Sequence, residues 1–349
     1  MKAVLRLNNY GMRLMLPNQD QLKIDIDSLL SKYATGDAYK DQLIRDFMLS
    51  TVLFNWEDPE PDEILPLTEG LNEIRLAIAM FKGHKYTPKI TIFGSARTEK
   101  ENELYQLTFQ FAKLAADYGY KIITGAGPGI MEAGNSGAGP TNSFGLALHL
   151  PFESFSKVFE NHPQNMTIFK HFYSRKLTFY RESQAIVVMP GGFGTMDEIF
   201  QGLASIQTGK YNVRPFILLD KPDGTFWKEF DEWIQKNLLG DRYITGSDTC
   251  FYQLATSAHD TMTIIQKFYH HFHSYFMIND RLFLQLKIQL SPDQLHSANK
   301  IAIENGFGDL VYIRDRYYNN TTLFVYSCQK HNKHSFAIIH QLITHINGF

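Results

Sequence analysis

The chain has 349 residues, of which 44% are hydrophobic and 20% are charged, and its formal net charge at pH 7 is −2. These values are ordinary for a globular protein, and so small a charge gives no general attraction to nucleic acid or to an anionic membrane, so we expect neither as a partner. Cys250 and Cys328 are the only cysteines, too few for a disulfide framework or a four-thiolate metal site. No apolar stretch is long enough to span a membrane and the first residues lack a signal-peptide core, so we expect a cytoplasmic protein.

A chain of this length suits a central domain with additional parts, and residues 1–85 are expected to form a mainly helical first part. After two short apolar alternations, apolar residues recur with helical spacing at Leu22–Leu30, Leu43–Phe54 and Leu71–Phe81. The acidic, proline-containing segment Trp56–Glu63 predicts an exposed connection within this region.

Residues 86–273 are predicted to form an α/β domain, because strand-like and helical patterns alternate along them. Such alternation is typical of a doubly wound parallel sheet covered by helices on both faces. The predicted strands are Ile90–Phe93, Lys121–Thr124, Phe144–His149, Ala185–Met189 and Pro215–Leu219. The predicted helices are Glu101–Tyr118, Phe172–Glu182, Met196–Gln207, Phe226–Asn237 and Ala258–Phe272.

Residues 274–349 have a different composition and are predicted to form a small α+β module. A period-two alternation covers residues 281–290, and two further strands are expected at Leu310–Ile313 and Thr322–Ser327. Helices are expected at Pro292–Glu304 and Phe336–Ile346. Nothing in this module suggests chemistry, so we expect it to serve regulation or contact between subunits.

Glycine-rich turns follow three of the predicted strands and precede helices. The carboxyl ends of parallel strands share one edge of a sheet, where ligands bind at the switch point, so these distant turns are expected to form one site. Glycines let backbone amides approach an anion at a helix N-terminus, which predicts a nucleotide or sugar phosphate as ligand. The residues concerned are Gly94 and Ser95 in the first turn, Gly125, Gly127, Gly129, Met131 and Glu132 in and after the second, and Gly191, Gly192, Gly194 and Thr195 in the third.

Other interpretations of these turns compete with a phosphate site. The turn Gly125–Gly129 is also compatible with a simple tight turn before a helix. It does not fit the dinucleotide spacing, and the next strand ends in His149-Leu150-Pro151 without a ribose-binding acid, which argues against NAD. No Gly-Lys-Ser/Thr sequence follows any turn, which argues against a triphosphate-binding P-loop.

Charged residues near the third turn also have two interpretations. Thr195 and Glu198 have the spacing of a capping box, in which Glu198 would only satisfy a backbone amide in the first turn of the helix. Arg175 and Lys176 lie on the preceding helix, where a solvated face is the usual environment. Taken together with the glycine turns, however, these charges predict a catalytic site.

Three histidines near the end of the α/β domain, His270, His271 and His273, are expected to be surface residues of a helix. No acid or thiolate stands at ligand spacing from them, so we expect no metal site.

The segment Pro190–Glu198 resembles the PGGxGTxxE motif of the LOG (Lonely Guy) family, and the pair Arg175-Lys176 resembles its upstream Arg-Lys pair. Gly94-Ser95 and Gly127–Glu132 look like the two earlier turns of that family, and its longer bacterial branch is the nearest likeness. The resemblance covers roughly residues 85–270. One departure is Ala204, where many members have a threonine, although Ser205 is adjacent.

The resemblance implies a modified Rossmann fold, a homodimer or higher homo-oligomer, and hydrolysis of nucleoside 5′-monophosphates to a free base and ribose 5-phosphate, without a cofactor. AMP, a related purine nucleotide or a cytokinin nucleotide is the expected substrate. Arg175 and Glu198 would be catalytic, and the residues of the three turns, with Lys176, would bind substrate. Members are often labelled lysine decarboxylases, but that chemistry requires pyridoxal phosphate on a lysine, and apart from Lys176 no lysine is marked for it. A non-catalytic nucleotide sensor or molybdenum cofactor carrier is the alternative.

Overall fold

The computed structural model describes residues 4–7, 13–16, 19–150, 155–279, 281–304, 307–313, 324–329 and 337–347. The chain forms two compact units, Met1–Leu71 and Asn72–Phe349. The beginnings of several predicted elements, at Ala3, Met12, Thr322 and Phe336, lie outside the described residues, as does Pro151. Within the described ranges, no helix is both long and apolar enough to cross a membrane.

The N-terminal unit is mainly helical, as predicted. The two short alternations form an antiparallel pair, β1 (Val4–Leu7) and β2 (Arg13–Leu16), and are followed by α1 (Gln19–Leu30), α2 (Ala38–Asn55) and the start of α3 (Pro61–Phe81). Asp37 caps α2 by accepting hydrogen bonds from the amides of Tyr39 and Lys40, which lack helical partners. An ion pair between Arg45 and Asp27 joins α2 to α1.

The second part of α3 belongs to the larger unit, although the sequence grouped residues 72–85 with the N-terminal region. The unit boundary falls inside this helix, after Leu71. Ala77 and Phe81 are buried in the core beneath the central sheet, and this burial explains why the end of α3 packs with the α/β domain.

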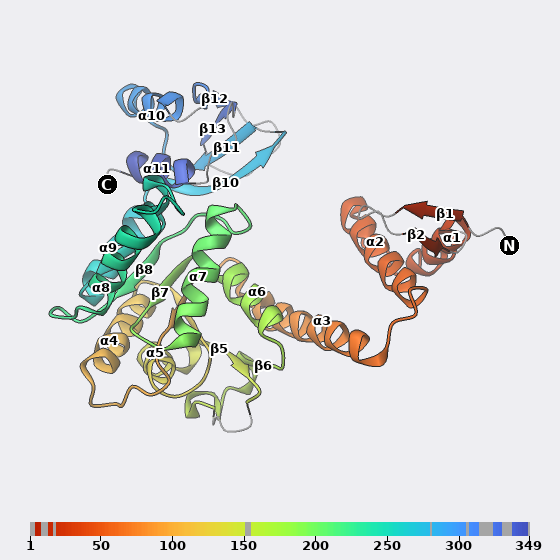
Figure 1. Ribbon diagram of the computed structural model, residues 1–349, viewed down its shortest axis with the longest axis horizontal. Helices are drawn as coiled ribbons and strands as arrows, with labels where there is room; N and C mark the ends of the chain where they lie inside the picture. The colour runs from red at the N-terminus through yellow and green to blue at the C-terminus, as the bar shows by residue number, and fades with distance from the viewer. Residues whose placement is uncertain are drawn as a thin grey trace. The chain divides into compact units, whose positions relative to one another are not determined.

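Seven parallel strands form the central sheet in the order β6-β5-β4-β3-β7-β8-β9, which confirms the predicted α/β class (Figure 1). The strands are β3 (Lys89–Phe93), β4 (Lys121–Thr124), β5 (Ser143–Leu148), β6 (Met166–Phe169), β7 (Ala185–Val188), β8 (Phe216–Leu219) and β9 (Gln253–Ala255). The central strands are buried on both faces, which explains why β7 and β8 are continuously apolar instead of alternating; β3 is equally buried but includes Lys89 and Thr91.

Helices cover the two faces of this sheet in separate sets. Alternate residues of β3 and β7 pack on α4 (Glu103–Asp117), α5 (Ile130–Ala138) and α9 (Ala258–Phe268). The residues between them pack on α3, α6 (Phe172–Glu182) and α7 (Phe193–Gln207). A further helix, α8 (Phe226–Trp233), continues as a π-helix over Ile234–Leu239. The alternation of side chains along each strand therefore determines which helix packs on which face.

The strand order has a switch point between β3 and β7. From β3 the chain proceeds outward through β4, β5 and β6, and then returns to add β7 on the other side of β3. The connections that leave β3 and β7 diverge at this point, which opens a crevice at the carboxyl edge of the sheet.

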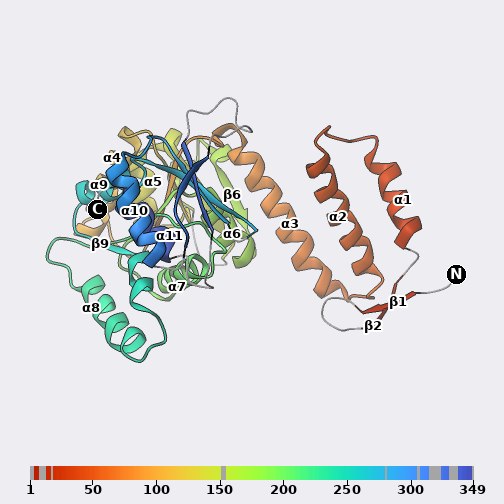
Figure 2. The same ribbon diagram turned by 90° about the horizontal axis from the view of Figure 1, so that it is seen from above.

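The C-terminal module is a four-stranded antiparallel sheet in the order β10-β11-β13-β12, with two helices beside it (Figures 1 and 2). Its elements are β10 (Phe272–Ile278), β11 (Arg281–Leu286), α10 (Pro292–Glu304), β12 (Val311–Ile313), β13 (Phe324–Gln329) and α11 (Ala337–Ile346). Its core includes Leu282, Leu284 and Ile343 and is continuous with the core under the central sheet. The predicted α+β module is confirmed.

The predicted helix Ala258–Phe272 is too long, so the prediction that the three histidines belong to a helix was wrong, although His270 and His273 are exposed as predicted. Helix α9 ends at Phe268, and Phe272 begins β10 by pairing with Leu286. His270 therefore lies in the connection, the Nδ1 of His271 contacts the carbonyl oxygen of Ile346 at 2.9 Å, and His273 belongs to β10. A buried strand position was mistaken for the last turn of a helix.

Candidate active site

The three glycine turns meet at the backbone of Ser95. Its amide donates to the carbonyl of Pro190 in the third turn at 3.2 Å, and its carbonyl accepts from the amide of Ile130 after the second turn at 3.0 Å. In addition, the Met189 amide donates to the carbonyl of Phe93 at 2.8 Å. The convergence that the sequence predicted at the carboxyl edge is thus present, and a single residue of the first turn joins the other two.

Two glycines are required by this close approach. Gly129 has a φ of +67°, and a Cβ there would lie 2.4 Å from the carbonyl oxygen of Ser95. A Cβ on Gly191 would lie 2.1 Å from the hydroxyl oxygen of Thr195 and 2.9 Å from the amide nitrogen of Ser95. Any side chain at either position would separate the turns.

A cavity of about 850 Å³ opens where the turns meet. Of the residues predicted for the site, Gly94, Ser95, Gly125, Met131, Arg175, Gly191, Gly192, Gly194, Thr195 and Glu198 line it. The lining does not include Gly127, Gly129, Glu132 or Lys176. Glu132 pairs with Lys100 at 3.0 Å, and Lys176 forms an ion pair with Asp197.

The sequence analysis missed the apolar part of the lining. Phe172 and Phe179 of α6 line the cavity. Leu148, the last residue of β5, and Leu150, two residues later, line it as well. The signal was present, because Phe172, Arg175 and Phe179 have the helical spacing of three and four residues that places side chains on one face. Ala204, which departs from the resembled family, is exposed and does not line the cavity.

Arg175 is held by carbonyl groups at the ends of two strands. Its Nε donates to the carbonyl of Leu146 at 2.7 Å, and its Nη2 approaches the carbonyl oxygen of Gly125 at 3.5 Å. The guanidinium carbon also lies 5.2 Å from the centre of the Phe179 ring. These contacts fix a positive charge in the wall of the cavity.

Glu198 does not cap the helix, so the capping-box interpretation was wrong. Helix α7 begins at Phe193 after the N-cap Gly192, and no side chain caps it. The Met196 amide already donates to the Gly192 carbonyl at 3.0 Å, which places Glu198 in the second turn and not in the first. The early helix start leaves the first amides of α7 directed at the cavity instead.

The carboxyl group of Glu198 is in an unusual environment. The residue is 7% exposed, and its Oε2 is buried with no hydrogen-bond partner among the described residues. Burial raises the pKa of this carboxyl from 4.5 to about 7, although the positive charges of Lys176 and Arg175 oppose the rise. The backbone carbonyl of Glu198 accepts a hydrogen bond from the Tyr180 hydroxyl, which holds this turn against α6.

Comparisons with known proteins agree with this fold. Residues 126–265, which contain Arg175, Glu198 and two of the three turns, match the family model described as "Possible lysine decarboxylase". No curated protein matches the chain.

Several solved structures are similar over 52% of this chain. They include the molybdenum cofactor binding protein from Rippkaea orientalis (19% identity, TM-score 0.37, 96% of that chain covered). The molybdenum cofactor carrier protein from Chlamydomonas reinhardtii has 17% identity, a TM-score of 0.36 and 97% coverage of that chain. DNA processing protein A from Helicobacter pylori has 16% identity, a TM-score of 0.37 and 81% coverage of that chain. The match to this family model lies within the α/β domain, which has a Rossmann-like parallel sheet.

Proposed function

We propose that the cavity binds a nucleoside 5′-monophosphate and that the protein hydrolyses its N-glycosidic bond to a free base and ribose 5-phosphate. The observation that carries this proposal is Glu198, a buried carboxyl without a hydrogen-bond partner among the described residues, in the same cavity as the N-terminus of α7. A perturbed carboxyl in a concave site beside an anion-binding helix end is the arrangement expected of an active site.

The N-terminus of α7 provides the place for the 5′-phosphate. Its first amides lack partners within the helix, and the helix dipole favours an anion there. A Cβ on Gly192 or Gly194 would meet no atom within 4 Å, and neither has a positive φ, so the fold itself does not require glycine at these positions. We infer that they are glycines because a side chain would occupy the space that the phosphate needs.

The proposed chemistry uses two of the four charged residues that line the cavity, Arg175 and Glu198; the other two are Arg97 and Asp197. When water attacks the anomeric carbon and the bond to the base breaks, positive charge develops on the ribose, and an ionised Glu198 stabilises it and accepts the proton of the water. With a pKa of about 7, the carboxyl is largely ionised just above neutral pH and still basic enough to take that proton. Arg175 positions the nucleotide and stabilises the electron pair that leaves with the base, and the base takes up the proton that Glu198 accepted from water, which regenerates the carboxylate.

The apolar lining supports a purine nucleotide as substrate. The volume of about 850 Å³ is in the range of small-molecule sites, and Phe172, which is exposed, offers aromatic surface for a base. AMP or a related purine or cytokinin nucleotide is therefore our proposed substrate.

Decarboxylation of lysine is not supported by this cavity. That reaction needs pyridoxal phosphate bound to a lysine as a Schiff base. The described lining contains no lysine, and Lys176 is engaged in an ion pair with Asp197, which does line the cavity. The name of the matching family model therefore does not describe the chemistry that these residues support.

The test is hydrolysis of a nucleotide panel by wild type and by Glu198→Gln. General acid or base catalysis contributes about 10² to 10⁴-fold, so the variant should lose activity by that factor while it keeps its fold. Glu103→Gln is the matched control, because Glu103 is an exposed carboxylate at the start of α4 that pairs with Lys221. Free base is measured by chromatography with AMP, GMP, CMP and UMP. Undiminished hydrolysis by Glu198→Gln would overturn the assignment, and intact bound ligand without release of base would favour a sensor or carrier.

A further inference from the structure

Arg214 is a buried cation at the amino edge of the sheet, the edge opposite the candidate active site. It precedes β8 and is 8% exposed. Among the described residues, no carboxylate lies within ion-pair distance of it. A buried charge without an opposite charge is costly, so the groups that compensate it need to be identified.

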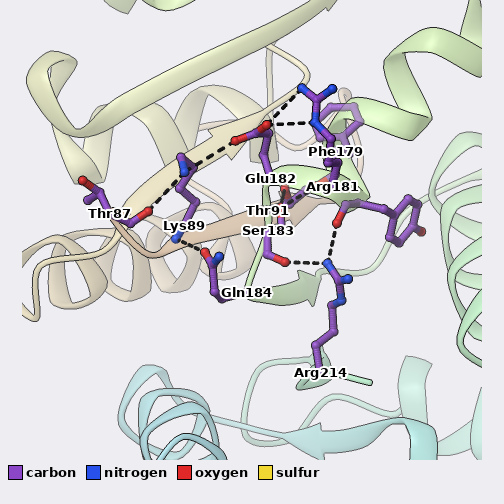
Figure 3. Close-up of polar contacts among 10 residues, drawn as sticks. Thr87, Lys89, Thr91, Phe179, Arg181, Glu182, Ser183, Gln184 and Arg214 are labelled. Carbon is purple, nitrogen blue, oxygen red and sulfur yellow. Dashed lines mark hydrogen bonds and ion pairs between the residues drawn. The ribbon is translucent and has the colours of Figure 1, made fainter. Parts of the chain in front are cut away.

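Backbone carbonyls engage part of the guanidinium (Figure 3). Nη1 donates to the carbonyls of Tyr180 and Ser183 at the end of α6, and Nε donates to the carbonyl of Asn212 at 3.0 Å. An arginine at the C-terminal end of a helix is favourable, because the helix carbonyls carry partial negative charge there. These bonds use three of the five N–H groups, and the two on Nη2 make none of the bonds found among the described residues.

A cavity of about 220 Å³ lies beside Arg214, between the α/β domain and the C-terminal module. Arg181 and Asn212 line it from the α/β domain, and His273 and Tyr275 line it from β10. The Tyr275 hydroxyl accepts from the amide of Val213 at 3.4 Å. Burial raises the pKa of Tyr275, so its hydroxyl keeps a proton that it can donate.

The charges around this cavity are mainly positive. Arg181 pairs with Glu182 at 3.0 Å, but Arg181 lines the cavity whereas Glu182 does not. Lys287 donates a hydrogen bond to the carbonyl of Tyr269, which is another lining residue. Burial lowers the pKa of His273, and the nearby positive charge of Lys287 lowers it further. His273 therefore stays neutral near pH 7, and no carboxylate is among the described residues that line the cavity.

We propose that this cavity is a binding site for a small oxyanion, namely a phosphate group, either as inorganic phosphate or on a small phosphorylated compound. Nη2 of Arg214 carries two N–H donors that none of the described hydrogen bonds uses, and Arg181, whose guanidinium pairs with Glu182, also lines the cavity. A volume of about 220 Å³ is below the range of pockets that enclose drug-sized ligands, which excludes a whole nucleotide. A bound anion would join the C-terminal module to the end of α6.

The experiment is titration of the full chain with phosphate, followed by location of the bound anion. The candidate active site is also expected to bind phosphate, so crystals are soaked in selenate, whose anomalous scattering places each anion directly. A peak within hydrogen-bond distance of Arg214 Nη2 supports the proposal, and no peak there at saturating selenate overturns it. A peak at α7 tests the proposed function separately, so either proposal can fail without the other.

Matched variants add a measurement in solution. Arg181→Gln keeps the buried Arg214 and should fold, and it is expected to weaken phosphate affinity at this site about tenfold or more. Arg214→Gln, if it folds, should weaken this affinity by a similar factor. Arg242→Gln, a change at an exposed arginine outside the cavity, should bind as wild type does. Calorimetry with phosphate, glycerol phosphate and acetate at constant ionic strength distinguishes free phosphate, a phosphorylated compound and any carboxylate. If Arg181→Gln bound phosphate as wild type does, both in the Arg214 cavity and in the candidate active site, this result would contradict the proposal.

Discussion

The environment of Glu198 makes the stability of the fold depend on pH. The folded protein binds the proton of this carboxyl more tightly than the unfolded chain does, since burial raises the pKa from 4.5 to about 7. This contribution to stability is fully present below pH 4.5 and is lost as the pH rises through about 7. The shift corresponds to roughly 3 kcal/mol, which the fold gives up at higher pH to keep an ionised carboxylate in the cavity.

We therefore expect Glu198→Gln to be more stable than wild type at pH 8 by up to roughly 3 kcal/mol, and by less than about 1 kcal/mol at pH 5. Urea unfolding at the two pH values measures the difference in free energy of unfolding. Glu103→Gln, whose side chain is exposed, should show the same small difference at both. A pH-independent difference for Glu198→Gln would mean that its pKa is not raised.

Sequence patterns predicted which residues line the cavity better than they predicted where the helix that carries Glu198 begins. The glycine turns and the charges at positions 175 and 198 were identifiable because turn chemistry is local. Whether Glu198 caps a helix or faces a cavity depends on where α7 begins, and α7 begins at Phe193, three residues before the predicted start at Met196. Arg214 carried no local signal at all, because only the fold places a cavity beside it.

At the scale of elements, α3 supports the helix that carries Arg175. No side chain of the N-cap His171 caps α6. Instead, the carboxylate of Glu73, which is 6% exposed on α3, accepts the Lys170 amide at 2.7 Å and the Ser174 hydroxyl. Glu73 thus ties the residue before the N-cap and the first turn of α6 to another helix, directly before Arg175, and its negative charge lies at the N-terminal end of α6.

Replacing Glu73 should therefore affect both stability and the site. Glu73→Ala removes the charged acceptor of a part-buried amide and one of the two acceptors of the Ser174 hydroxyl, which also donates to the His171 carbonyl, so we expect a loss of about 1–3 kcal/mol in the free energy of unfolding. If Glu73 positions Arg175, the KM for AMP should rise more than kcat falls. Arg75→Ala, an exposed change on the same helix, should alter stability by less than about 0.5 kcal/mol. Equal effects of the two variants would contradict a positioning role for Glu73.

Strands buried on both faces were predictable, whereas short edge strands were not. β7 is a continuous apolar run followed by Met189-Pro190, and β3, between Pro88 and Gly94, is apolar except for Lys89 and Thr91. β6 and β9, at the two edges of the sheet, have four and three residues with mixed burial, and such short patterns cannot be separated from loops. Pairing with β5 and β8, respectively, defines them as strands, and pairing is a property of the whole sheet.

For the whole molecule, α6 and α7 present an apolar surface that suggests self-association. The ion pair between Lys176 and Asp197 shows that these helices are neighbours. Their large exposed side chains are Phe172, Tyr173, Leu177, Phe193 and Phe200, of which Phe193 is 96% exposed. Clusters of exposed apolar residues commonly mark interfaces, and a closed dimer is the commonest assembly of like subunits. Since Phe172 and Phe193 also line the candidate active site, the mouth of the cavity would lie beside the interface.

We expect the purified protein to be a dimer or a higher oligomer of the 40.2-kDa chain, which light scattering coupled to gel filtration measures directly. Phe200→Glu places a charge in this surface at a position that does not line the cavity, and it should shift the equilibrium toward the monomer because burying an unpaired charge is costly. Tyr118→Glu changes an exposed aromatic residue that follows α4 on the other face of the sheet, and it should leave the assembly unchanged. A wild type that stays monomeric at high concentration would show that this surface does not mediate self-association. If Phe200→Glu is monomeric and inactive, then assembly and the shape of the cavity mouth are coupled, since Phe193 would lose the partner that covers it.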